Sequence, residues 1–338
     1  MTSIRLRCLN LFEHESSLLS LVNKRRKTAR NDDFYPKSLE KPGVLELYST
    51  QLNAINRIKS LANVPIILPF IFFEDNKVEI TLYQIDAFAT KVFEGNPAAI
   101  CPLDTWLGDE LMQSIAAENN LSETAFFVPK GTGYEIRWFT PVNEVDLCGH
   151  ATLAAAYVLF NILDYNKDKV EFYSKSGLLA VVKDNDFLTL DFPAQPPVSC
   201  DVPETLVKAF GLVPIECLKS KDYIAVFEHE RDVELANPDL EALKQLDLRG
   251  VIITARSERY DYVTRFFAPK YGIPEDPVTG SAYTQLVPYW ESKTGLKKFT
   301  AKQVSTRSGE LTCEIVNERV LISGKAIRYL EGKIEIET

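Results

Sequence analysis

The chain has 338 residues, which is long enough for two domains that each bury a core of their own. With 46% hydrophobic and 25% charged residues, the composition excludes a disordered chain. The net charge of -9 disfavours nucleic acid as a partner, because affinity for phosphates depends mainly on clustered Lys and Arg. We therefore expect a binding site for a small molecule.

Cysteine and histidine placement gives no sign of a metal site. The six cysteines are widely spaced without a CxxC pair, and the three histidines are scattered. Reduced thiols and a cytoplasmic location are the expectations. The most apolar stretch, residues 64–73, contains two prolines and is too short to cross a bilayer as a helix, so no membrane segment is predicted.

The first 78 residues differ from the rest of the chain. Residues 1–31 contain seven basic and two acidic side chains, which is a net charge of +5. A nuclear address or a transit peptide has a similar composition. We prefer a poorly ordered basic extension followed by a linker near residues 31–43, and we assign residues 1–78 no catalytic role.

From Glu79 the pattern of apolar residues predicts regular elements. Alternation predicts a strand that runs toward Phe88, followed by a loop with glycine and proline. Helical spacing of apolar residues predicts an amphipathic helix over 109–119. A turn and an apolar run over 125–128 follow, which places Glu123 at the entrance of a strand.

The rest of the chain repeats itself, which predicts a duplicated fold. The offset between matching segments is 128 to 132 residues. A proline-rich stretch over 194–202 suits a linker, so we expect a first half over 79–196 and a second half over 197–338. The C-terminal end of the second half could pack back on the first. The matches are Arg137, Phe139 and Pro141 with Arg265, Phe267 and Pro269; Cys148-Gly149-His150-Ala151 with Thr279-Gly280-Ser281-Ala282; and Ser176-Gly177 with Ser308-Gly309.

The repeat places a glycine at the start of one helix in each half, Gly149 and Gly280. The free N–H groups and the positive dipole end of a helix N-terminus bind anions. Glycine at these positions lets the backbone approach a ligand closely. We therefore expect a carboxylate to bind in a cleft between the halves. Pro288 is expected to limit the second helix to about two straight turns before a kink or an end.

Residues 79–338 contain a set of motifs that resembles the PhzF, or phenazine biosynthesis-like, isomerase family. The resemblance implies an α/β diaminopimelate-epimerase-like fold, in which each half is a sheet wrapped around a central helix. It also implies a homodimer with no metal and no organic cofactor. The motifs include Asp86-Ala87-Phe88, Gly95-Asn96-Pro97-Ala98, Asn120-Leu121-Ser122-Glu123-Thr124, Phe139-Thr140-Pro141, Cys148-Gly149-His150-Ala151-Thr152, Arg265-Phe266-Phe267-Ala268-Pro269 and Glu275-Asp276-Pro277-Val278-Thr279-Gly280-Ser281-Ala282.

The resemblance also implies roles for individual side chains. Glu123 would move a proton between two carbons of a dihydro-hydroxyanthranilate-type acid, and burial would raise its pKa so that it serves as acid and base. His150 would orient the substrate or assist the transfer. Asp276 would hold an amino or hydroxyl group and Ser281 a carboxylate, although a turn residue and a helix N-cap are alternative readings.

Cys148 corresponds in the repeat to Thr279, which cannot be a thiolate, so racemisation by two facing cysteines is disfavoured. We expect Cys148 to line the substrate site without a catalytic role. Many members of the resembling family carry a histidine where this chain has Tyr283. The resemblance therefore specifies the fold better than it specifies the substrate. Three functions remain open: a proton-shifting isomerase, an epimerase or racemase that uses Glu123 with Asp276 or His150, and a binding protein that kept the fold without the chemistry.

Overall fold

The computed structural model describes residues 77–337, so the expectations for residues 1–76 lie outside the described residues. The first strand begins at Lys77 and therefore includes the last two residues of the segment 1–78. None of the described helices is both long and apolar enough to span a bilayer.

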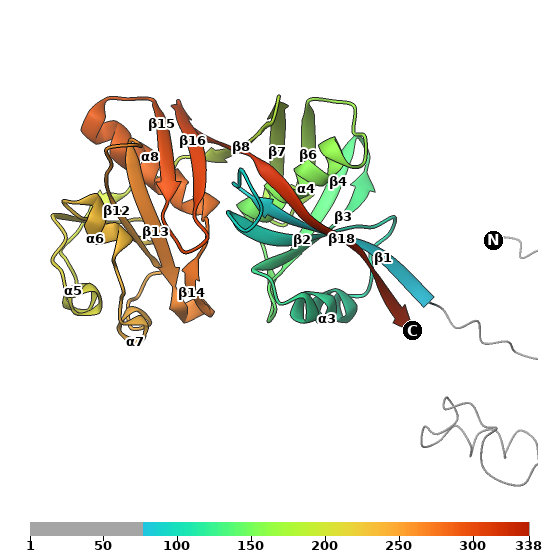
Figure 1. Ribbon diagram of the computed structural model, residues 1–338, viewed down its shortest axis with the longest axis horizontal. Coiled ribbons are helices and arrows are strands. Elements are labelled where there is room, and N and C mark those ends of the chain that lie inside the picture. The colour runs from blue at the N-terminus through green and yellow to red at the C-terminus, as the bar shows by residue number, and fades with distance from the viewer. Residues whose placement is uncertain (1–76, 338) are drawn as a thin grey trace, which may run out of the picture. The chain divides into compact units, whose positions relative to one another are not determined.

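The first half of the described chain contains two helices and eight strands (Figure 1). The predicted strand toward Phe88, the helix over 109–119 and the strand entered at Glu123 are all confirmed. The elements are β1 (Lys77–Ala87), β2 (Asn96–Pro102), α3 (Asp109–Asn119), β3 (Glu123–Lys130), β4 (Gly133–Phe139), β5 (Glu144–Val145), α4 (Gly149–Asn161), β6 (Lys169–Ser174), β7 (Gly177–Asp184) and β8 (Phe187–Pro193).

The second half contains more short helices on its surface. Its elements are β9 (Val198–Ser199), α5 (Glu204–Phe210), β10 (Glu216–Lys219), β11 (Tyr223–Val226), α6 (Glu230–Glu234), α7 (Leu240–Leu243), β12 (Val251–Arg256), β13 (Tyr262–Ala268), η2 (Pro269–Tyr271), β14 (Ile273–Asp276), α8 (Gly280–Thr294), β15 (Lys298–Gln303), β16 (Gly309–Val316) and β17 (Arg319–Gly324), followed by β18 (Ala326–Glu337).

The two halves have the same strand topology. In the first, β2 is parallel to β3, β3 antiparallel to β4, β4 parallel to β6, and β6, β7 and β8 are successive antiparallel neighbours. In the second, β11, β12, β13, β15, β16 and β17 repeat this order with the same directions. The predicted duplication is confirmed by this repeat of hydrogen-bonded pairs.

The chain passes between the halves twice. After β8 it enters the second half, where β9 pairs with β10. After β17 it returns, and β18 pairs with β1 over eleven residues, from Lys77↔Glu337 to Ala87↔Ala326. Strands β8 and β17 also pair with each other. The first half therefore contains a strand from the C-terminal end of the described chain, and this strand and the β8–β17 pairing hold the two halves together.

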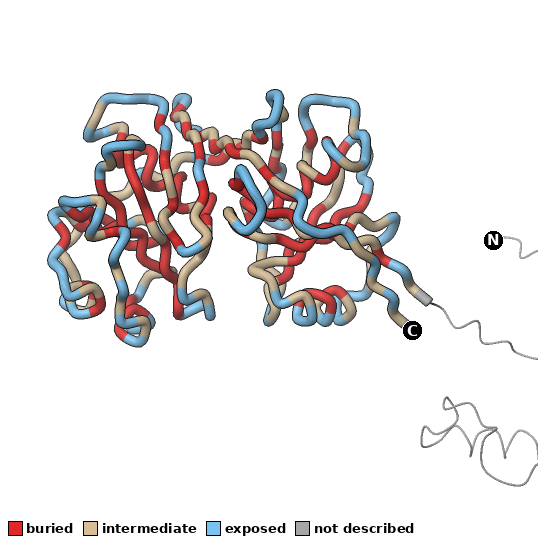
Figure 2. Tube along the Cα trace, in the orientation of Figure 1, coloured by how far each residue is buried: buried red, intermediate tan, exposed pale blue. Residues whose placement is uncertain are grey.

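Each sheet wraps around one helix. Helix α4 is apolar on nearly all sides and contacts β1, β2, β3, β7 and β8, as expected for a helix buried within a sheet. Helix α8 is buried in the second half, where Trp290 stacks on Tyr262 with ring centroids 5.5 Å apart. Figure 2 shows both helices within the buried interior. The expected sheet around a central helix is confirmed in both halves.

Helix α8 does not end at Pro288. It continues through Pro288 to Thr294, over fifteen residues. Proline has no N–H to donate to the carbonyl four residues before it, which is that of Thr284. The backbone N–H of Gln195 donates to this carbonyl instead, at 2.9 Å. An end at Pro288, one of the two expected outcomes, is therefore wrong, because a segment distant in sequence satisfies the group that proline leaves free.

The repeated Arg-x-Phe motif stabilises each sheet. Arg137 forms a two-pronged ion pair with Glu144, with N···O distances of 2.8 and 2.9 Å. Arg265 pairs in the same way with Glu275, at 2.6 and 3.0 Å. Each guanidinium also lies over the phenylalanine two residues later, at 5.1 and 5.0 Å from the ring centroid. The first ion pair joins β4 to β5 and the second joins β13 to β14, and each lies next to the start of the central helix of its half.

Gly250 precedes β12 and has no room for a side chain. A Cβ there would lie 2.6 Å from the Phe267 carbonyl oxygen and 2.8 Å from the Phe266 ring. We expect Gly250→Ala to lower the free energy of unfolding by about 1–3 kcal/mol, the usual cost of overpacking. Urea denaturation measures it. Gly332→Ala is the control, since its Cβ would lie 3.5 Å from Leu330; an equal loss in both variants would contradict the steric explanation.

Candidate active site

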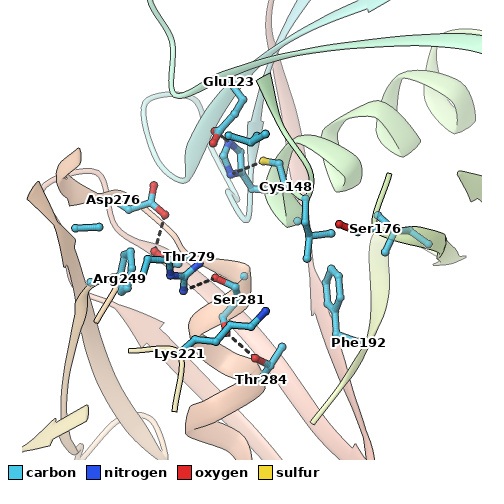
Figure 3. Close-up of a pocket in the computed structure, with 18 of the residues that line it drawn as sticks. Glu123, Cys148, Ser176, Phe192, Lys221, Arg249, Asp276, Thr279, Ser281 and Thr284 are labelled. Atoms are coloured by element: carbon cyan, nitrogen blue, oxygen red, sulfur yellow. Dashed lines mark hydrogen bonds and ion pairs between the residues drawn. The ribbon is translucent and has the colours of Figure 1, made fainter. Parts of the chain in front are cut away.

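The N-termini of α4 and α8 meet beside a cavity of about 640 Å³ that residues of both halves line (Figure 3). Gly149 and Gly280 are the first residues of these helices, and a Cβ on either would lie 3.8–3.9 Å from the Cα of the other. The first N–H groups of a helix have no intrahelical partner. Two sets of backbone donors therefore point toward one cavity, as the sequence predicted.

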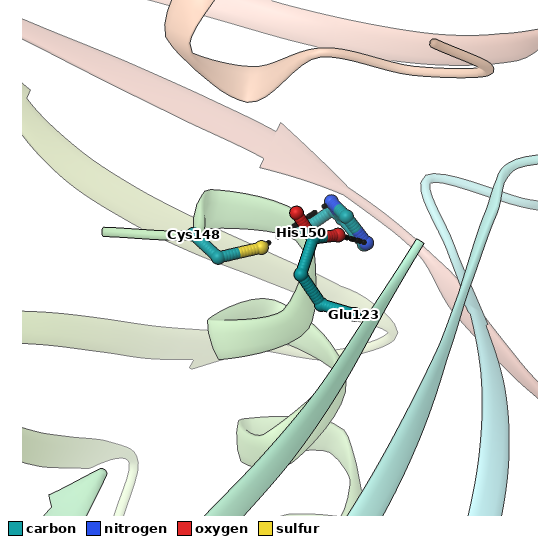
Figure 4. Close-up of side chains that lie close together, drawn as sticks. All are labelled: Glu123, Cys148 and His150. Atoms are coloured by element: carbon teal, nitrogen blue, oxygen red, sulfur yellow. Dashed lines mark hydrogen bonds and ion pairs between the residues drawn. The ribbon is translucent and has the colours of Figure 1, made fainter. Parts of the chain in front are cut away.

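Glu123 begins β3 and lines this cavity, with 13% of its side chain exposed. Its Oε2 lies 3.2 Å from Nε2 of His150 (Figure 4), and neither of these two buried atoms has a hydrogen-bond partner among the described residues. Burial raises the pKa of Glu123 to about 8; the charge of Asp276 adds to the rise and a hydrogen bond from Cys148 opposes it. The carboxyl is therefore mainly protonated at neutral pH.

His150 is the second residue of α4, and 5% of it is exposed. Its Nδ1 lies 3.3 Å from Nδ2 of Asn96 and 3.5 Å from Sγ of Cys148. An amide nitrogen can donate but not accept, so the contact with Asn96 favours the tautomer with an unprotonated Nδ1 and a proton on Nε2. Burial lowers the pKa of His150 to about 3. The ring is therefore neutral at pH 7, with Nε2 next to Glu123.

Asn96 connects the groups of the site, although the sequence assigned it no role. It is fully buried, accepts a hydrogen bond from Ser122 at 3.1 Å, and donates to Asp276 at 2.7 Å and to the Val278 carbonyl at 3.0 Å. The signal available in the sequence was the Gly95-Asn96-Pro97 motif. A buried side-chain amide here links the first half to the second.

Asp276 ends β14 and faces the cavity from the second half. It accepts hydrogen bonds from Asn96 and, at 2.6 Å, from the Thr279 hydroxyl. Burial raises its pKa to about 6, and these two donors oppose the rise. Asp276 is thus the site carboxylate that is mostly ionised at neutral pH while Glu123 holds its proton.

Ser281 is the second residue of α8, and its Oγ accepts from Arg249 at 3.1 Å. The N-cap position belongs to Thr279, so the alternative reading of Ser281 as the N-cap is wrong. Tyr283 does not line the cavity: it is fully buried beside Tyr262 in the core. Its departure from the family pattern therefore changes the core rather than the wall of the site.

Cys148 lines the cavity opposite the position of Thr279 in the repeat. Its donor atom, with those of Glu123 and His150, lies in a group whose members are all within 4.8 Å of one another. A metal ion would bind one imidazole nitrogen of His150, and Glu123 and Cys148 would both have to lie next to that nitrogen. Instead Nε2 lies next to Glu123 and Nδ1 lies next to Cys148. Burial raises the pKa of the Cys148 thiol well above its ordinary value, which also disfavours the thiolate that a metal needs. The geometry suits hydrogen bonding better than chelation.

Equivalent positions in the two halves carry different chemistry. Thr124 pairs with Phe139 and Val251 pairs with Phe267, so Gly250 occupies the place of Glu123. The preceding residue is Arg249, whose Nε and Nη2 bind the buried Asp222 at 2.8 and 2.5 Å. No motif in the sequence indicated a role for Arg249, because its carboxylate partner Asp222 lies 27 positions away in the chain.

The model of the phenazine biosynthesis-like protein family matches residues 85–332. The chain belongs to this family. A Pseudomonas aeruginosa protein described as an uncharacterized isomerase is 50% identical over 259 residues, which cover 77% of this chain and 100% of that protein.

Solved structures of PhzF-family proteins are similar to this one. The Enterococcus faecalis protein has 46% identity and a TM-score of 0.75, and the alignment covers 76% of this chain and 99% of that chain. A putative PhzC/PhzF protein of Clostridium difficile has 44% identity and a TM-score of 0.73, with 76% and 100% covered. The family resemblance read from the motifs is confirmed.

The raised pKa of Glu123 predicts how pH changes the stability of this PhzF-family protein. Between its ordinary value of 4.5 and about 8, the folded chain keeps a proton that the unfolded chain loses, so this group destabilises the fold as pH rises. Glu123→Gln removes the effect. The variant should gain stability over the wild type by up to about 1.4 kcal/mol per pH unit in this range. Urea unfolding from pH 4.5 to 8 tests it; a constant difference would contradict a raised pKa.

Proposed function

We propose that this PhzF-family protein is an isomerase that moves a proton within a small carboxylic acid, with Glu123 as the shuttle and no cofactor. The observation that carries the proposal is a buried carboxyl group whose Oε2 has no hydrogen-bond partner, in a cavity where two helix N-termini meet. A carboxyl with a pKa of about 8 can take a proton and return it near neutral pH.

The substrate carboxylate binds at the N–H groups of Gly149 and Gly280, where both helix dipoles favour negative charge. The ionised form of Glu123 removes a proton from a carbon next to the double-bond system, and the electron pair shifts along that system. Protonated Glu123 then returns the proton to another carbon. The dihydro-hydroxyanthranilate type of acid has the required allylic arrangement.

Neighbouring groups keep this proton transfer on Glu123. His150 is neutral and presents Nε2–H to the carboxylate, so it can stabilise the ionised form without accepting the proton itself. Asp276, held by Asn96 and Thr279, can accept a hydrogen bond from an amino or hydroxyl group of the substrate. Ser281 and Cys148 complete the wall between the two helices.

An epimerase or racemase is the second candidate. It needs two acid–base groups on opposite faces of a carbon, and Asp276 is a second buried carboxyl with a raised pKa on the other half. Two facing thiols cannot be these acid–base groups, because Thr279 occupies the position equivalent to Cys148. In heavy water an epimerase inverts configuration at one labelled carbon, whereas the isomerase moves a double bond, and NMR of the product separates the two outcomes.

Glu123→Gln should lower the turnover of a dihydro-hydroxyanthranilate-type acid by about 100- to 10,000-fold, the usual contribution of one acid–base group. Binding of the acid should remain, since the amide keeps the size of the side chain. Glu118→Gln on the exposed side of α3 is the matched control and should keep full activity. Near wild-type turnover in the Glu123→Gln variant would exclude the proton shuttle.

The pH dependence of kcat/KM should identify the base. Activity should rise with pH up to about 8, because the base must lose its proton. Asp276→Asn removes a negative charge that raises the pKa of Glu123, so the rise should move to lower pH in this variant. A profile that is flat from pH 5 to 9, or a shift to higher pH in Asp276→Asn, would contradict the assignment.

A further inference from the structure

The second-half end of the cavity contains cationic side chains that the proton shuttle does not use. Lys221 and Arg249 line it together with Ser281 and Thr284 at the N-terminal end of α8. Figure 3 shows Glu123 and Lys221 at opposite ends of the labelled group. We call these four residues the second-half anion pocket.

Contacts with buried side chains fix the position of the Arg249 guanidinium. Its partner Asp222 is fully buried and is itself bound by the buried Gln285, whose Nε2 donates at 2.7 Å. The guanidinium also lies over the Phe266 ring, 5.2 Å from the centroid. These contacts occupy Nε and Nη2, while no hydrogen bond among residues 77–337 uses Nη1. A fixed guanidinium with unused N–H donors is suited to recognise an oxyanion.

Lys221 supplies positive charge that no nearby carboxylate balances. It is exposed, it lines the cavity, and no ion pair of its ammonium occurs in the described part of the chain. The other cations of the cavity wall are balanced: Arg249 by Asp222, and Arg319 by Asp191 at 2.8 Å. Lys221 is therefore the cation of the cavity wall that has no ion-pair partner among the described residues.

The cavity wall next to this pocket also has an unsatisfied polar atom. Gln195 lines the cavity and donates its backbone N–H to the carbonyl of Thr284. Its side-chain Oε1 is buried and has no hydrogen-bond partner. Buried polar atoms are nearly always hydrogen-bonded, and an amide oxygen only accepts, so a hydrogen-bond donor of a ligand or an ordered water is expected here.

We propose that the substrate is a diacid, whose second anionic group, a carboxylate or a phosphate, binds between Lys221 and Arg249 while the reacting end lies beside Glu123. This rests on the proposed function, because the first carboxylate is the one assigned there to the helix N-termini. Hydrogen bonds between charged partners are roughly twice as strong as those between neutral groups, enough to select diacids from monoacids.

Isothermal titration of the full chain tests this with glutarate, adipate and pimelate, each against the monocarboxylate of equal chain length. At least one diacid should bind about 10-fold more tightly than its monoacid, which is 1.4 kcal/mol. Lys221→Met should reduce that ratio to within about twofold, and Lys221→Arg should keep it, because the cation is retained. The matched control Lys208→Met removes an exposed lysine of α5 outside the cavity and should change nothing.

Replacing one carboxylate of the preferred diacid by a phosphonate decides between the two anion types, since the tighter ligand identifies the native group. Equal binding of diacids and monoacids, no binding of any diacid at millimolar concentration, or equal losses for both classes in Lys221→Met would overturn the proposal. Binding requires no chemistry, so Glu123→Gln can lose turnover or keep it without changing these ratios. Failure of the diacid proposal is thus distinct from failure of the proton shuttle.

Discussion

The N-termini of α4 and α8 face each other at Gly149 and Gly280, and the rest of the structure depends on this contact. Two positive dipole ends at this distance repel each other unless an anion lies between or beside them. The wrapped sheets, the β8–β17 pairing and the return of β18 to β1 hold the helices against that repulsion. In the proposed function the substrate carboxylate binds here, at a site that the backbone forms before any charged side chain is considered.

The fold is symmetric, but the chemistry is not. Both halves keep the ion pair that fixes the strand before the central helix, so the backbone of the site is the same in each. At equivalent positions the first half has Glu123 where the second has Gly250, and His150 where the second has Ser281. The second half instead positions Arg249 through buried Asp222. This difference is the reason that we propose proton transfer on one side of the cavity and anion recognition on the other.

Burial determines the charge of each acid–base group. Desolvation disfavours the charged form, so it raises the pKa of Glu123 and Asp276 and lowers that of His150. The two carboxyls differ because Asp276 receives hydrogen bonds from Asn96 and Thr279, whereas Oε2 of Glu123 receives none. One physical cause therefore leaves a neutral acid next to a neutral imidazole, with an ionised carboxylate on the opposite half.

The sequence by itself determined the repeat, the helix over 109–119, and the placement of Glu123 at a strand entrance. Those features depend on local periodicity and on glycine and proline, which act over a few residues. Only the tertiary structure decided that α8 continues past Pro288, because Gln195 satisfies the free carbonyl of Thr284. It alone also brought Asn96 to Asp276 and Arg249 to Asp222. Hydrogen bonds between residues 27 to 180 positions apart leave no periodic signal in the chain, so they become visible only once it is folded.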